Sequence, residues 1–162
     1  MMTFQTAPSN SAAPAAAPVR GDRFEIVVPQ GWKTLTSGGD VVLEHSTGAS
    51  LLVRRITQTK TLAAYAQQQA ERVMSPLGFA KLGEPKYFKD DHDELVQYEI
   101  FGNRLSEHHR VLYRALRRGN AFYEFVFEAG EDHFDALLTE AQAIASSVQA
   151  ITEAPPVRRA RR

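Results

Sequence analysis

The sequence predicts an α+β domain in which a mostly antiparallel sheet of about 6–7 strands is flanked by two main helices. Three observations support this class. Apolar residues recur at every second position in several short segments, as in half-buried strands. They recur at three- and four-residue spacing in two longer segments, as in amphipathic helices. Short turns join successive strands, and the order strands, helix, strands, helix favours an antiparallel sheet over a doubly wound parallel one.

The domain is expected to span residues 24–151, between two segments of different composition. Residues 1–23 are rich in alanine, proline and serine, which predicts a flexible leader with little to bury. This leader lacks a charged stretch followed by an apolar one, so it is not a signal peptide. Residues 152–162 contain two prolines and four arginines and predict a basic tail. Since the net charge of the chain is zero, the domain itself is mildly acidic.

The first half of the domain opens with one short strand, which a hairpin follows. The segment FEIVV, 24–28, is a short strand that ends at Pro29, because proline cannot donate to a sheet. Trp32 follows directly and is interpreted as a core residue at one end of the domain, with ligand stacking as the alternative. The segments at 40–45 and 49–56 read as a hairpin around a turn that contains glycine.

Two segments have the spacing of amphipathic helices. The first, 61–73, has apolar residues on one face, and either Thr59 or Thr61 can cap its start. The second, 131–148, follows the helical spacing almost without error and begins with acidic residues, which suit the positive end of a helix. The two helices are therefore expected to pack on the sheet through these apolar faces.

The second half of the sheet is predicted from four segments. Residues 81–89 form a weak edge strand interrupted by Pro85, and residues 95–102 form a clear alternating strand. A hairpin of 108–117 and 121–128 follows, with Gly119 and Asn120 at its turn.

A row of arginines in this hairpin is the main candidate for function. We assign one mixed face to the hairpin, and cross-strand pairs between its arginines and glutamates would make it an ordinary solvated surface. Alternatively, two helices leave this face partly uncovered, and a protein or a small ligand binds there. Nucleic acid is not expected, because glutamates alternate with the arginines and the domain is acidic. The predicted partner-binding residues are Arg110, Leu112, Arg114, Leu116, Phe122 and Val126.

Motifs for catalysis, cofactors and metals are not found in the sequence. The chain has no cysteine, which excludes disulfides, thiolate zinc sites and a cysteine nucleophile. It has neither a GxSxG elbow nor a glycine-rich phosphate loop, so we expect no enzyme and no cofactor. His108 and His109 point to opposite sides of a strand and cannot bind one metal together. The acidic run 90–94 is interpreted as a solvated turn, with weak divalent-ion binding as the alternative.

The longest apolar runs are far shorter than the roughly 20 residues that span a bilayer, so no membrane insertion is expected. Together with the lack of cysteine, this favours a cytoplasmic protein.

The order of elements and several local patterns resemble the PsbP-like superfamily. These patterns are FEIVVPQGW at 24–32, TLAAYAQQQAERV at 61–73, the three-strand meander from 95 to 128, and FDALLTEAQAIASSV at 134–148. The superfamily includes the PsbP subunit of photosystem II, the Ran-binding import factor Mog, the lipoprotein DcrB and the Eag chaperones of type VI secretion effectors.

This resemblance implies an antiparallel sheet flanked by helices and mostly non-enzymatic work. It implies a protein-binding adaptor or chaperone that is associated with a bacterial secretion system, whose partner is a secreted effector or an assembly component. An uncovered apolar face also allows a symmetric homodimer. The alternative function is a module that binds a small ligand or a divalent ion. No functional residue of the superfamily is carried over to this sequence.

Overall fold

A computed structural model describes residues 16–57 and 60–151 of the chain. Within these residues the chain forms two helices and two antiparallel sheets. The helices are α1 (Leu62–Met74) and α2 (Glu131–Ser146). The larger sheet contains β3 (Trp32–Ser37), β4 (Asp40–His45), β5 (Ser50–Ile56), β6 (Gly78–Leu82), β7 (Lys86–Lys89), β8 (Asp93–Arg104), β9 (Glu107–Arg118) and β10 (Ala121–Gly130). The smaller sheet contains β1 (Ala17–Gly21), β2 (Phe24–Val28) and β11 (Gln149–Ala150).

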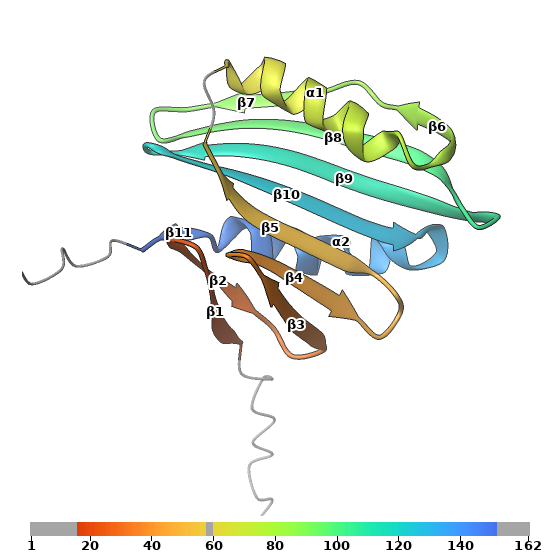
Figure 1. Cartoon of the computed structure of the whole chain (residues 1–162), viewed down its shortest axis with the longest axis horizontal. Helices are drawn as coiled ribbons and strands as arrows, with labels where there is room; N and C mark the ends of the chain where they lie inside the picture. Colours follow the sequence, from red (N-terminus) through yellow and green to blue (C-terminus); the bar gives the residue numbers. More distant parts are fainter. Residues whose placement is uncertain (1–15, 58–59, 152–162) are drawn as a thin grey trace, which may run out of the picture.

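The larger sheet lies between the two helices (Figure 1). Its strand order is β3-β4-β5-β10-β9-β8-β6, and β7 also pairs with β8. The helix α1 covers β8 and β9 on one face, whereas α2 covers the other face together with the smaller sheet. The predicted α+β class, with an antiparallel sheet and two flanking helices, is confirmed.

Each helix packs through the apolar face that the sequence predicted. The helix α1 begins after Thr61, whose Oγ1 accepts a hydrogen bond of 3.3 Å from the backbone N–H of Ala64. The small side chains of Ala66 and Ala70 bring α1 close to the sheet. On the other face the ring of Phe134 in α2 packs against that of Phe127 in β10, with centroids 5.1 Å apart. The sheet therefore has an apolar layer on both sides.

The leader that we predicted over residues 1–23 is wrong for part of this range. Ala17–Gly21 form β1, which pairs with β2 in register from Ala17 opposite Val28 to Gly21 opposite Phe24. Because β1 lies at the edge of the smaller sheet, Pro18 is tolerated there, and Val19 packs against the core. Composition alone does not reveal such an edge strand. Residues 1–15 of the leader and the predicted basic tail, 152–162, lie outside the described residues.

Trp32 begins β3 and is buried in the core, in agreement with the core interpretation of the sequence. Its Nε1–H donates a hydrogen bond of 2.9 Å to Oε1 of Glu140 in α2. The larger sheet also has more strands than predicted, because the segment 32–37 is a strand without apolar alternation and because the strand predicted over 81–89 is divided into β6 and β7. The contact with Glu140 ties this unpredicted edge of the sheet to α2.

Candidate functional site

The six residues that we predicted to share one face of the hairpin are divided between its two faces. Leu112 lies opposite Phe127, and Leu116 lies opposite Tyr123. Directly opposite residues in an antiparallel pair project from the same face. The side chains that face α2 are therefore those of Arg110, Leu112, Arg114 and Leu116, whereas those of Phe122 and Val126 face α1.

The reason lies in the turn. Two residues, Gly119 and Asn120, separate the paired residues Arg118 and Ala121. An even-numbered residue of β9 therefore pairs with an odd-numbered residue of β10, and the assumption of equal parity was wrong. Leu112 is 7% exposed and Leu116 is 5% exposed, and the other four residues are half-buried. That any of the six residues contacts a partner stays a prediction.

The arginine row of β9 is paired mainly with residues outside β10. Arg110 forms ion pairs with Glu99 of β8 and with Asp135 of α2. Arg118 forms a two-point ion pair with Asp93 of β8, at 3.2 and 3.1 Å. These contacts neutralise both ends of the row within the protein. We considered pairs between arginines and glutamates within the hairpin itself. These two arginines instead pair with carboxylates of β8 and α2.

A different surface stands out at the end of the sheet where β8 turns into β9. The β4–β5 turn, the start of β6 and the first turn of α2 lie at the same end (Figure 1). Two adjoining hollows of about 650 and 690 Å³ lie there and share Ser106. We call this region the hairpin-end surface. Its large apolar and charged lining residues include Phe79, Arg104, Leu105, Glu107, Glu131 and Asp132.

Two large apolar side chains on this surface are almost fully in water. Phe79 is 96% exposed and Leu105 is 100% exposed. Both have positive φ, of 49° and 48°, and Ser106 has a φ of 70°. Positive φ at both residues of a two-residue hairpin turn is the pattern of a type I′ turn, which asparagine and glycine favour. Leucine in this conformation is strained by roughly 1–2 kcal/mol, and the sequence offers no local reason for it.

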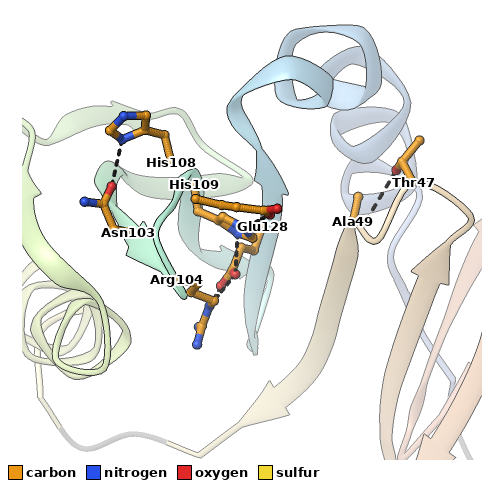
Figure 2. Close-up of polar contacts among 8 residues, drawn as sticks. Thr47, Ala49, Asn103, Arg104, His108, His109 and Glu128 are labelled. Carbon is orange, nitrogen blue, oxygen red and sulfur yellow. Dashed lines mark hydrogen bonds and ion pairs between the residues drawn. The ribbon is translucent and has the colours of Figure 1, made fainter.

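A polar cluster lies next to the turn between β8 and β9 (Figure 2). The carboxylate of Glu128 accepts hydrogen bonds of 2.5 and 2.8 Å from Nε and Nη2 of Arg104. Nδ1 of His109 lies 2.9 Å from Oε2 of the same carboxylate. His108 points elsewhere, with its Nδ1 2.7 Å from Oδ1 of Asn103 (Figure 2). The hydrogen bonds that Arg104 donates to Glu128 raise the pKa of Arg104, so this cation stays charged and holds the end of β8 in place.

Within the described residues, no group of three or more His, Asp or Glu side chains is arranged to hold a metal ion. In the acidic run 90–94, the carboxylate of Asp90 accepts the backbone N–H groups of His92 and Asp93, at 2.8 and 2.7 Å. These hydrogen bonds lower the pKa of Asp90. This carboxylate therefore closes the turn between β7 and β8. No helix in the described part of the chain is long and apolar enough to cross a membrane.

Solved structures share this architecture. The cyanobacterial PsbP (CyanoP) of Synechocystis sp. PCC 6803 is 19% identical and matches 91% of this chain and 98% of its own, with a TM-score of 0.60. The Ran-binding protein Mog1p of Saccharomyces cerevisiae is 9% identical and matches 85% and 97%, with a TM-score of 0.57. LpqN of Mycobacterium tuberculosis, involved in cell envelope biogenesis, is 14% identical and matches 85% and 86%, with a TM-score of 0.55.

These similarities show that the chain has the PsbP-like fold, as its sequence patterns suggested. No protein-family model and no curated protein matches the sequence. At these levels of identity the likeness concerns the fold alone, and a function must be argued from the chain's own residues.

Proposed function

We propose that this chain is a non-enzymatic protein-binding adaptor or chaperone whose partner docks on the hairpin-end surface. The observation that carries the proposal is the strained exposure of Phe79 and Leu105 beside two hollows. Strained residues that persist at one place in a fold are typical of functional sites. The neighbour Mog1p is a Ran-binding protein, which supports protein binding as a use of this fold.

The energy available from these two side chains is substantial. Full burial of a leucine or phenylalanine side chain contributes about 1.5–3 kcal/mol each. Two such anchors therefore contribute roughly 3–6 kcal/mol, which corresponds to about a hundredfold to ten-thousandfold in affinity. Large apolar anchors surrounded by polar groups are also the usual composition of an interface centre.

The charges beside the anchors specify the partner's chemistry. Glu107, Glu131 and Asp132 are exposed and line the polar hollow next to the β8–β9 turn. Arg104 is already bound to Glu128 and does not offset them. A complementary partner therefore presents apolar side chains next to lysine or arginine. Since salt screens exposed charges, this part of the affinity should weaken between low and physiological ionic strength.

A double substitution tests the proposal without damage to the fold. Asparagine tolerates positive φ, so Phe79→Asn with Leu105→Asn removes both anchors while it relieves backbone strain. The wild-type chain is used to capture partners from cells of its source, and mass spectrometry identifies them. The binding constant of the purified partner is then measured for each variant. We expect the double variant to bind at least about 100-fold more weakly.

Leu35→Asn is the matched control, because Leu35 is exposed on β3 at a distant edge of the sheet. It should bind the partner as the wild type does. Equal binding by the double variant would place the partner elsewhere and contradict the proposal.

We also propose a role in secretion, a homodimer and a cytoplasmic location for this protein. A role in a bacterial secretion system predicts that the captured partner is a secreted effector or an assembly component. A homodimer through the hairpin-end surface predicts a dimer in sedimentation velocity that Phe79→Asn with Leu105→Asn converts to a monomer. A cytoplasmic location is tested by cell fractionation.

A further inference from the structure

Arg114 differs from the other two arginines of its row in having no carboxylate partner. Its Nε and Nη2 both donate to Oε1 of Gln97, at 3.2 and 2.8 Å. Arg110 is paired with Glu99 and Asp135, and Arg118 with Asp93. Among the described residues, the neutral amide oxygen is the only hydrogen-bond acceptor of this guanidinium group.

The surroundings of Arg114 shield this charge partly from water. It lies in the middle of β9 under α2, and burial lowers the pKa of its guanidinium group. A guanidinium group stays charged at neutral pH even so, because its ordinary pKa lies far above neutral pH. A half-buried cation without a counter-charge has lost part of its hydration, and an anion that reaches it is therefore stabilised.

A small pocket opens beside this cation at the end of the sheet away from the hairpin-end surface, where β8 begins and β9 and α2 end. Its volume is about 170 Å³, below the roughly 300–1,000 Å³ of sites for drug-sized ligands. Most of its wall is apolar, and its lining residues are Phe88, Asp93, Leu95, Arg114, Leu116, Arg118, Ala145 and Ser146.

The other charges at the pocket do not oppose an anion. The carboxylate of Asp93 is bound at two points by Arg118, so that pair is neutral. Nη1 of Arg118 also donates to the backbone oxygens of Ser146 and Val148, which reduces the negative potential at the end of α2. Lys86 pairs with Gln97 across β7 and β8, so it projects from the same face and adds positive charge.

We propose that this pocket binds a small molecule or chain end with one carboxylate and a short apolar group. The carboxylate is held by the free N–H groups of Arg114, which has five donors and uses two of them on Gln97. The apolar group packs against Phe88, Leu95 and Leu116. Two sources share this chemistry, a free aliphatic acid and the C-terminal carboxylate of a protein.

Hexanoate is the probe for the first source, and N-acetyl-leucine imitates the second. Binding to the full chain is measured by calorimetry, with hexanol as the uncharged control. We expect hexanoate to bind at least tenfold more tightly than hexanol. Tighter binding of N-acetyl-leucine than of hexanoate indicates a protein C-terminus, and the reverse order indicates a free acid. Absence of binding by both acids, or equal binding of hexanol and hexanoate, overturns the proposal.

Two substitutions remove the anion site in opposite ways. Arg114→Met keeps an apolar side chain of similar reach and removes the charge. Gln97→Glu keeps the charge but supplies an internal carboxylate, which should also raise the melting temperature. Each variant should weaken hexanoate binding at least tenfold, whereas Arg55→Met, a change in an arginine of β5, should leave it unchanged. Wild-type affinity in Gln97→Glu, which removes no group from the core, contradicts the assignment even if Arg114→Met folds poorly.

Discussion

Tyr65 connects α1 to the larger sheet through a carboxylate that is almost fully buried. Its phenol oxygen donates a hydrogen bond of 2.7 Å to Oε2 of Glu124 on β10, and Glu124 is 3% exposed. A hydrogen bond to a charged group contributes about 1.5–3 kcal/mol to stability, and a buried acceptor without its donor is costly. We therefore expect Tyr65→Phe to lower the free energy of unfolding by about 1.5–3 kcal/mol.

Urea unfolding followed by the fluorescence of Trp32 measures this change, because Trp32 is the single tryptophan of the chain. At about 3 °C per kcal/mol for a domain of this size, the melting temperature should fall by roughly 4–10 °C. Tyr123→Phe is the control: the Tyr123 hydroxyl is also buried but has no hydrogen-bond partner in the described residues. Its removal should change stability by less than about 0.5 kcal/mol or increase it. Equal losses from both substitutions would refute the reasoning that the carboxylate sets the cost.

Three further predictions concern stability. Burial, followed by its hydrogen bond, raises the pKa of Tyr65, so the folded state holds this proton above pH 10 while the unfolded chain releases it. The free energy of unfolding therefore keeps its full value below about pH 10 and falls above it by up to about 1.4 kcal/mol per pH unit. Urea titrations at pH 9 and 11 should show this fall, and Tyr65→Phe should reduce it. Gly102→Ala places a new Cβ 2.7 Å from Cβ of the buried Leu77 and should cost about 1–3 kcal/mol in urea unfolding, whereas Gly78→Ala, with only ordinary contacts, should be nearly neutral. Leu105→Asn should increase the melting temperature, because asparagine suits the positive φ of the turn, and a decrease would mean that Leu105 is not strained.

Local patterns in the sequence were sufficient for most of the fold. The strand 24–28 has the bounds of β2, and the helix expected from residue 61 begins at Leu62 after its Thr61 cap. The faces of the last hairpin were wrong although the turn itself was correct. Because Gly119 and Asn120 are the two residues of that turn, they already determine which residues of β9 and β10 lie opposite each other. Alternation within a strand defines its two faces, but only the register set by the turn shows which faces of β9 and β10 coincide.

The features that sequence reasoning missed depend on contacts between distant segments. Strands β1 and β11 form only because both pair with β2, from opposite ends of the described chain. Phe79 and Leu105 occupy a bulge and a turn that neither residue favours, so no propensity points to them. The partner of Arg114 comes from β8, and only the pairing of Gln97 with Arg114 shows that it is not a carboxylate. Sequence alone could identify the arginine row but not which member of it lacks a counter-charge.

The two proposed sites are independent of each other for a geometric reason. Leu105 lies in the turn that precedes β9, and Arg114 lies nine residues along the chain from it, so they are roughly 30 Å apart at about 3.3 Å per residue of extended strand. A molecule small enough for a pocket of about 170 Å³ cannot reach both. Substitutions this far apart, without shared contacts, act additively. Arg114→Met should therefore leave partner capture unchanged, and Phe79→Asn with Leu105→Asn should leave hexanoate binding unchanged. Loss of partner capture in Arg114→Met would contradict this independence and would indicate a partner that extends along β9 to the Arg114 pocket, whereas a change of hexanoate affinity in the double variant would show that the two sites are coupled through the protein.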